Sequence, residues 1–275
     1  RQIFKQFQFA DGLDTRRPLH RLYPLGWTGS RGQGEVGSDL GLIVLIALSG
    51  CARNAQKHGK TIPQEFLIGT TIDTQNTDGD TALILALDKD NNEIAHQLID
   101  KGAKLDLKNS GGNTALIFAA AKGNTEIARK LIAKSASLNI QNKDGDTALI
   151  FATAKGNTKI VDKLIDKGAK LDTQNATGDT ALIAAAANDN PDVVKMLIKE
   201  KAQLDIQTKR GNTALMVAAA NGDERLIQLF IDKGARLDIR NRNGVTALDI
   251  AMKSNNAAAA KRLEAAMTGK RASKK

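Results

Sequence analysis

Short apolar stretches recur along the chain at a constant spacing, separated by polar segments that contain glycine. The fragment Gly-Asp-Thr-Ala-Leu-Ile starts at Gly79, and close variants of it follow at a step of 33 residues. These variants start at Gly112, Gly145, Gly178, Gly211 and Gly244. A Leu-Asp or Leu-Asn pair keeps the same step, with its leucine at positions 105, 138, 171, 204 and 237. Two marks in register indicate an array of internal repeats.

Within one unit, the hydrophobic pattern predicts two helices joined by a tight turn. Thr-Ala-Leu opens a short apolar helix in each unit, and a second, amphipathic stretch follows. In one such stretch the pattern places Ile127, Ala128, Leu131 and Ile132 on a single helical face. Between the helices stands a residue of a type that tolerates a left-handed backbone. These turn residues are Asp90, Gly123, Gly156, Asp189, Gly222 and Asn255.

The second helix of most units ends before a glycine, which suits the left-handed backbone common at helix C-termini. Those glycines are Gly102, Gly168 and Gly234, whereas Ser135 and Lys201 occupy the same position in two other units. If the backbone is left-handed there, each of these two residues costs about 1 kcal/mol. The units that contain Ser135 and Lys201 are therefore expected to be the softest part of the array.

The period, the Gly-x-Thr-Ala-Leu opening and the Gly-Ala-Lys-Leu-Asp close resemble the ankyrin repeat, over roughly residues 60 to 265. The resemblance implies an all-α repeat solenoid, a stack of helix-turn-helix pairs with β-turn fingers. The sequence departs from the family's Thr-Pro-Leu-His opening, because alanine replaces the proline and mostly isoleucine replaces the histidine. Alanine is a good helix former, and we expect isoleucines 84, 117, 150 and 183 to replace the histidine's hydrogen bonds by packing.

A unit of this size cannot bury its apolar face alone, so the two ends of the array should differ from its middle. The predicted repeat domain, 60–268, consists of a half repeat at 60–75, full repeats at 76–108, 109–141, 142–174, 175–207 and 208–240, and a capping repeat at 241–268. The cap carries the charged residues Asp249, Lys253, Lys261 and Arg262. Residues 269–275 are predicted to form a flexible basic tail.

One unbroken apolar run, Gly41 to Gly50, stands before the array and stops at the only cysteine, Cys51. The run is half as long as a membrane-spanning helix but matches a signal-peptide core. Leu-Ser-Gly-Cys resembles a bacterial lipoprotein signal, which implies lipidation of Cys51, a signal segment at 38–50 and a tether at 51–59. Ala52 after the cysteine implies the outer membrane and a periplasm-facing protein. The alternative is an apolar segment that docks on the repeats, with a chance cysteine.

The residues before this run, 1–37, show no apolar periodicity and are interpreted as a leader or a misassigned start. The flank Glu-Val-Gly-Ser-Asp lacks the positive charge that a signal peptide needs directly before its core. A soluble cytoplasmic or host-delivered protein, with Cys51 unmodified, therefore remains the alternative location. Gly32, Gly34 and Gly37 fit a dinucleotide fingerprint, but neither a strand before them nor a βαβ unit after them supports a cofactor site.

Composition narrows the function classes. The net charge of +10 attracts nucleic acid, anionic lipid and acidic proteins alike, but aromatic residues make up only 3% and offer little to stack on bases. One cysteine and three scattered histidines provide no metal site, and no catalytic constellation or phosphate loop is present. We therefore expect no cofactor, no enzyme activity and no specific nucleic-acid target, and interpret the chain as a monomeric protein-protein interaction module.

The contact positions that the ankyrin resemblance implies fall on loop tips and first-helix ends. They are Asp78, Asp80, Asp88, Lys89, Lys108, Lys122, Lys143, Lys155, Lys209, Arg210, Asn221, Arg240, Arg242 and Lys253. In the first full repeat they include three acids and two bases, while the fifth repeat and the cap together provide five bases and no acid. We hypothesise a polarised groove whose C-terminal half binds an acidic patch on an unidentified partner protein. The alternative is repeat drift on a solvated surface.

Overall fold

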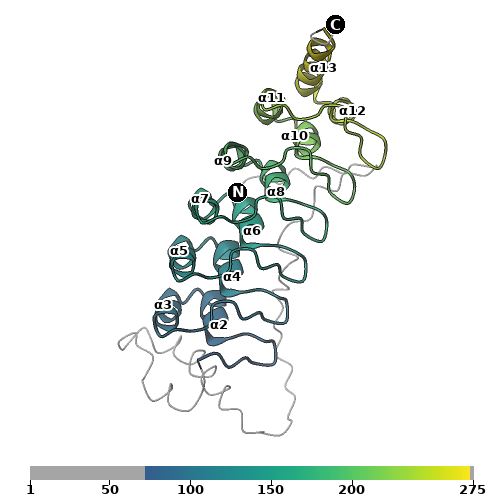
Figure 1. The fold of residues 1–275 in the computed structure, drawn as a ribbon. Helices are drawn as coiled ribbons and strands as arrows, with labels where there is room; N and C mark the ends of the chain where they lie inside the picture. The colour runs from purple at the N-terminus through teal and green to yellow at the C-terminus, as the bar shows by residue number, and fades with distance from the viewer. Residues whose placement is uncertain (1–71, 273–275) are drawn as a thin grey trace, which may run out of the picture. The chain divides into compact units, whose positions relative to one another are not determined.

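Residues 72–272 are described by the structure, a computed structural model, and they form a stack of helix pairs (Figure 1). The first helices of the pairs are α2 (Ala82–Asp88), α4 (Ala115–Lys122), α6 (Ala148–Ala154), α8 (Ala181–Ala187), α10 (Ala214–Asn221) and α12 (Ala247–Lys253). The second helices are α3 (Asn92–Asp100), α5 (Thr125–Ala133), α7 (Thr158–Asp166), α9 (Pro191–Lys199), α11 (Glu224–Asp232) and α13 (Ala257–Ala272). The predicted all-α repeat solenoid is confirmed.

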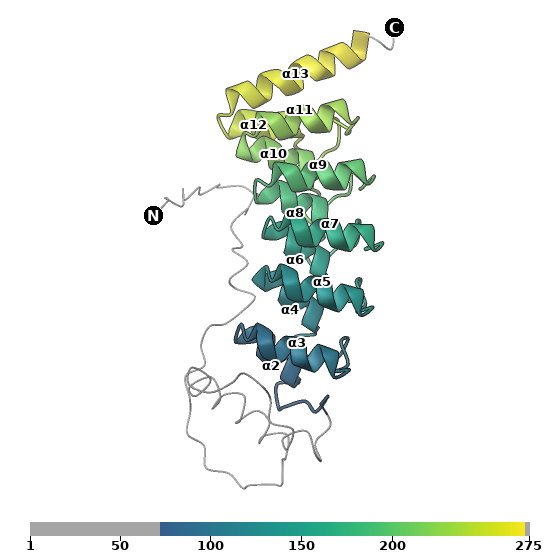
Figure 2. The ribbon, with the colours of Figure 1, turned by 90° about the vertical axis from the view of Figure 1, so that its left-hand side faces the viewer.

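The pairs stack in chain order, so each one covers the apolar face of its neighbour. In Figure 1 the second helices form one column and the first helices another, and the connecting loops project on the side away from the second helices. Figure 2 shows the second helices lying across the stack, with the longer α13 at one end. Among residues 72–272 the only β pairing is an isolated bridge between Gln75 and Thr81. No helix in this range is long and apolar enough to cross a membrane.

Each first helix begins at the threonine of its Thr-Ala-Leu opening. Thr81 Oγ1 accepts a hydrogen bond from Ile84 N at 3.2 Å, and the corresponding threonine caps each of the other five first helices. These helices lie between second helices and loops, so nearly all their side chains are buried. Isoleucines 84, 117, 150 and 183 are at most 3% exposed, which confirms that packing occupies the position of the family's histidine.

The turn between the two helices of each repeat has the left-handed backbone that the residue types predict. Asp90, Asp189 and Asn255 have φ values of 55°, 53° and 56°, and glycine occupies the other three turns. The second helix then buries one face only: Ile127 and Leu131 in α5 are fully buried while the side chains opposite are exposed. This confirms the predicted amphipathic pattern.

Left-handed backbone also follows each second helix, at the position usually held by glycine. Ser135 and Lys201 have φ values of 65° and 68°, close to the 83° to 85° of Gly102, Gly168 and Gly234. The two non-glycine residues thus adopt the conformation that was expected to cost energy.

The structure tests the predictions for the C-terminal end of the chain but not most of those for the N-terminal end. Helix α13 continues to Ala272 and so takes in the first four residues of the segment 269–275, which was predicted to be a tail. The leader, the apolar run, Cys51, its tether and most of the predicted half repeat lie outside the described residues.

Candidate functional site: loop tips and first-helix ends

The predicted contact residues lie on a surface formed by the loop tips and the C-terminal ends of the first helices. Main-chain hydrogen bonds fix the spacing of the tips, because an amide in each loop donates to a carbonyl oxygen in the preceding one. These pairs are Ser110 N to Asp78 O (2.8 Å), Lys143 N to Gly111 O (2.9 Å), Ala176 N to Asp144 O (2.7 Å), Lys209 N to Thr177 O (2.9 Å) and Arg242 N to Arg210 O (3.0 Å). Side chains at the tips are therefore presented at a regular interval.

A glycine makes this close approach of the loops possible. Gly178 has a φ of 86°, and a Cβ atom added to it would lie 2.6 Å from Lys209 N in the next loop. A side chain would therefore be strained by its own backbone and would also clash with the main chain of the following repeat.

Asparagine side chains form a second set of links between the loops, and one of these involves a predicted contact residue. Asn109 Nδ2 donates to Asp80 Oδ1 at 2.9 Å. Asp80 is half buried, and burial is the main reason that its pKa is raised, although the Asn109 bond opposes the shift. Asp80 thus holds two repeats together, and its carboxylate is only partly available to a partner.

A third set of links joins the loops through glutamine side chains, and it includes two further predicted contact residues. Gln141 Nε2 donates to its own loop at Gly145 O and to the next repeat at Gln174 O. In other repeats the position equivalent to Gln141 is occupied by Lys108 and Arg240. Lys108 Nζ donates to Gln141 O at 3.2 Å, and the Arg240 guanidinium donates to Gly244 O at 2.5 Å. Both basic side chains therefore also stabilise the scaffold.

In the first two repeats, the charged side chains at the C-terminal ends of the first helices α2 and α4 neutralise one another. Asp88 Oδ2 lies 3.0 Å from Lys89 Nζ, and Lys122 Nζ lies 2.9 Å from the Asp88 carbonyl oxygen. Lys122 also lies 3.6 Å from an Asp90 carboxylate oxygen. Farther along the stack, Asn221 Nδ2 donates to Ala186 O at 3.2 Å. Asp88, Lys89 and Lys122 thus form one network with Asp90, and Asn221 separately links its repeat to the preceding one.

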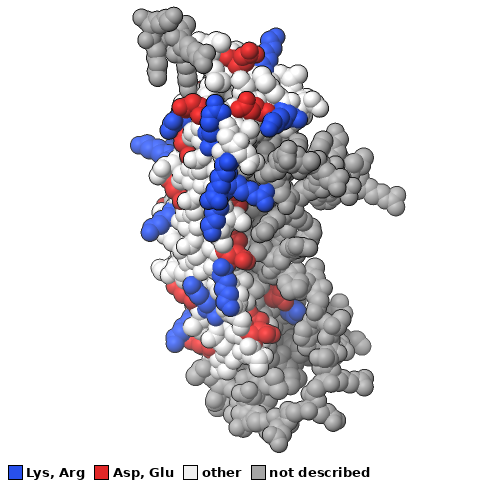
Figure 3. Space-filling model, turned by 90° about the vertical axis from the view of Figure 1, so that its right-hand side faces the viewer, with Lys and Arg blue, Asp and Glu red and all other residues white. Residues whose placement is uncertain are grey.

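The remaining predicted contact residues, Asp78, Lys143, Lys155, Lys209, Arg210, Arg242 and Lys253, are all exposed. Within residues 72–272, the side chains of Lys143, Lys155, Lys209 and Arg242 form no hydrogen bond or ion pair. Figure 3 looks onto the loop tips and shows basic side chains along the middle of this face, with fewer acidic ones beside them. Among these seven exposed residues, the basic ones all lie from the third repeat onward, and Asp78 of the first repeat is the acidic one.

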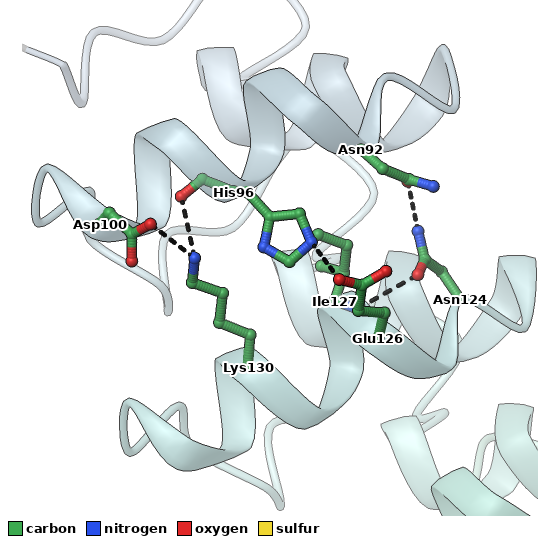
Figure 4. A network of polar contacts seen from close by, with 7 residues as sticks. All are labelled: Asn92, His96, Asp100, Asn124, Glu126, Ile127 and Lys130. Carbon is green, nitrogen blue, oxygen red and sulfur yellow. Dashed lines mark hydrogen bonds and ion pairs between the residues drawn. The ribbon is translucent and has the colours of Figure 1, made fainter.

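A polar network that was not predicted from the sequence joins the second helices α3 and α5 (Figure 4). His96 Nε2 lies 3.0 Å from Glu126 Oε1, and Lys130 Nζ lies 2.7 Å from Asp100 Oδ2. The hydrogen bond from Lys130 lowers the pKa of Asp100. At one edge, Asn124 Nδ2 donates to Asn92 Oδ1 at 2.5 Å. The paired side chains are 30 to 32 residues apart in the sequence, which is nearly one repeat, and this spacing could have indicated the network.

The comparisons with known proteins agree with this architecture. The family described as ankyrin repeats (3 copies) matches residues 48–142, 129–208 and 200–269, which together make up well over half of the chain. The first match begins before the predicted half repeat and includes Cys51. No curated protein matches the sequence significantly. The chain therefore belongs to the ankyrin repeat family, whose members are protein-interaction modules.

Proposed function

We propose that the loop tips and first-helix ends bind a partner protein, and that the partner presents an acidic patch to the C-terminal half of this surface. One observation carries the proposal: Lys209 and Arg242 are exposed at the tips of consecutive loops, and the bond from Arg242 N to Arg210 O at 3.0 Å fixes their spacing. Neither side chain has a polar partner among residues 72–272. Their charges are thus available to a ligand.

Lys143 and Lys155 of the third repeat extend the positive charge along the same surface. Complementary charge of this kind raises the association rate more than it raises affinity, and salt weakens it. The N-terminal end contributes little net attraction, because Asp88 is already paired with Lys89 and Lys122. We therefore place the contact with acidic groups between the third repeat and the cap.

A charge-matched pair of variants tests the proposal. Lys209→Ser/Arg242→Ser removes two positive charges from the loop tips, and Lys159→Ser/Lys233→Ser removes two from the second-helix side. Binding of a fluorescent glutamate-rich peptide is measured by anisotropy at low and moderate salt. We expect the loop-tip variant to bind about tenfold more weakly and the control to bind as the wild type does.

If both variants lost affinity for the peptide equally, net charge alone would explain the attraction. If the loop-tip variant bound the peptide as tightly as the wild type does, the proposal would be refuted. The same titration with duplex DNA tests the nucleic-acid alternative. If the protein bound DNA more tightly than the peptide, and both variants lost this binding equally, the result would favour a basic surface that binds anions nonspecifically.

We also propose that the protein is anchored in a bacterial envelope through Cys51, facing the periplasm. Support comes from the apolar run that ends at this cysteine, Gly41 to Gly50. The ankyrin match that begins at residue 48 and includes Cys51 favours the alternative, in which the apolar segment docks on the repeats and the cysteine is there by chance. A soluble cytoplasmic or host-delivered protein is the corresponding alternative.

Intact mass after expression in a Gram-negative host distinguishes these interpretations, with Cys51→Ser as the control. A chain that begins at residue 51 and carries a diacylglyceryl group and an acyl chain would support the anchor. An unmodified chain that retains the residues before 51 would reject it and favour the soluble alternative.

A further inference from the structure

The fourth repeat interrupts the row of cations on the surface of loop tips and first-helix ends. Ala176 occupies the tip position that Lys143 holds one repeat earlier and Lys209 one repeat later, and it is exposed. At the end of α8, Asn188 takes the place that Lys155 holds at the end of α6. These positions of the fourth repeat therefore offer a partner no positive charge.

The acidic residues of this repeat disfavour a partner carboxylate at the same place. Asp179 occupies the position of Asp80, is partly exposed, and accepts a hydrogen bond from Thr177 Oγ1 at 2.5 Å. Asp189 lies at the turn after α8, where it faces Asp223 of the next repeat. Because like charges repel, an acidic segment that crosses the fourth repeat should place an uncharged residue there.

The fourth repeat also exposes a small apolar side chain where its neighbours have large buried ones. One turn after the capping threonine, four of the other first helices carry side chains that are at most 6% exposed. They are Phe118, Phe151, Val217 and Ile250. Helix α8 instead carries Ala184, which is partly exposed although its side chain is the smallest of the set. Leu85 of α2 is also partly exposed, but its repeat carries the paired charges of Asp88 and Lys89.

Helical spacing places Ala184 on the surface that holds the cations in the neighbouring repeats. Ala184 lies three residues before Ala187 and four before Asn188, so these side chains share one face of α8. Asn188 Nδ2 donates to Ala184 O at 2.9 Å, which holds the amide against its own helix. Ala187, at the position of the predicted contact residue Asp88, is exposed. Ala184 and Ala187 thus form an apolar contact point between the cations of the third and fifth repeats.

We propose that the acidic partner segment carries one apolar side chain at its centre, which packs on this apolar contact point, between acidic groups that meet Lys155 and Lys209. This inference rests on the proposed binding function and specifies the partner. Packed helices lie about 8–10 Å apart, and an extended segment advances about 3.3 Å per residue. The acidic groups should therefore stand about three residues before and after the apolar one.

Two fluorescent peptides test this arrangement on the full chain by anisotropy. Both carry glutamates at that spacing around a central residue, which is leucine in one peptide and serine in the other. We expect the wild type to bind the leucine peptide about tenfold more tightly, because burying part of a leucine side chain is favourable. This preference should persist as the salt concentration rises, since salt does not screen an apolar contact.

Ala184→Phe tests the contact point itself, since Phe151 is accommodated at the same position one repeat earlier. The variant should bind the serine peptide as the wild type does and lose the preference for leucine, because its ring takes the space that the leucine would fill. Ala133→Phe, at the exposed end of the second helix α5, is the matched control and should keep the preference. Equal binding of both peptides by the wild type would overturn the proposal, and so would a preference that Ala184→Phe retains.

Self-association of the wild type that Ala184→Phe abolishes would also overturn the proposal, because it would assign the apolar contact point to a second copy of the chain. Failure of the proposed binding function has a different signature. The wild type and Lys209→Ser/Arg242→Ser would then bind the serine peptide equally. The two failures are therefore distinguishable.

Discussion

Replacing Asp146 by asparagine should stabilise the protein at neutral pH and change how its stability depends on pH. Asp146 is only 4% exposed, and burial raises the pKa of its carboxyl from 3.8 to about 6, although the bond from Asn175 opposes the shift. Asn113 and Asn212 occupy the same position in the second and fifth repeats and accept the same hydrogen bond from the following loop. An asparagine at 146 can thus keep the link without a buried charge.

The magnitude follows from the shift in pKa. A rise from 3.8 to about 6 is about two units, which corresponds to roughly 3 kcal/mol. Because the folded-state pKa is the higher one, the folded protein binds the proton more tightly than the unfolded chain between these two values. The contribution of this group to stability is therefore greatest at low pH and is lost as the pH rises from 3.8 to about 6.

Urea denaturation of the wild type and of Asp146→Asn, at a series of pH values from 3.5 to 7.5, measures this difference. We expect equal free energies of unfolding at the acid end and a gain for the variant of roughly 3 kcal/mol at neutral pH. Asn212→Asp is the reverse control: it places a carboxyl at a site that is 6% exposed, and it should introduce the dependence that Asp146→Asn removes. A gain for Asp146→Asn that does not vary with pH would refute the reasoning.

Three further predictions concern backbone conformation and helix capping. Ser135→Gly and Lys201→Gly should each raise the free energy of unfolding by about 1 kcal/mol in thermal or urea denaturation, because both residues are left-handed. Gly102→Ser, where a Cβ meets nothing within 4 Å, should lower it equally, and no loss there would contradict this explanation. Gly178→Ala should lower the free energy of unfolding by clearly more, since its Cβ would lie 2.6 Å from Lys209 N. A smaller decrease than that of Gly102→Ser would show that the loops adjust freely. Thr147→Ala removes the N-cap of α6 and should lower the free energy of unfolding by about 1 kcal/mol. An unchanged midpoint of urea denaturation would contradict this prediction.

The helices and turns could be predicted because each depends on a few consecutive residues. Thr-Ala-Leu supplies a cap and an apolar helix, and an aspartate such as Asp90 or a glycine such as Gly123 supplies the left-handed turn. The 33-residue period then determines which turn follows which helix. The fold was thus predictable from local chemistry and one spacing.

The hydrogen bonds between repeats were not predictable in the same way. Asp78 and Asp80 are two residues apart and both acidic, yet only Asp80 accepts a bond from Asn109 in the next loop. Which of them meets the neighbour depends on the stacking of the repeats, and this is a property of the folded array. For the same reason the sequence could not show that Lys108 and Arg240 contact main-chain oxygens. Their role in binding a partner stays a prediction.

The constant offset of the side-chain links has a consequence for how such a chain can change its length. Loop asparagines meet side chains 29 residues earlier, and the aspartate at the close of one repeat meets an amide 31 residues later, as Asp106 does with Ser137 N. Inserting or deleting one whole repeat leaves every donor opposite an equivalent acceptor. A change of any other length would leave the links at that junction unmatched, so genetic duplication in whole units is the route by which this array can grow or shrink and still fold.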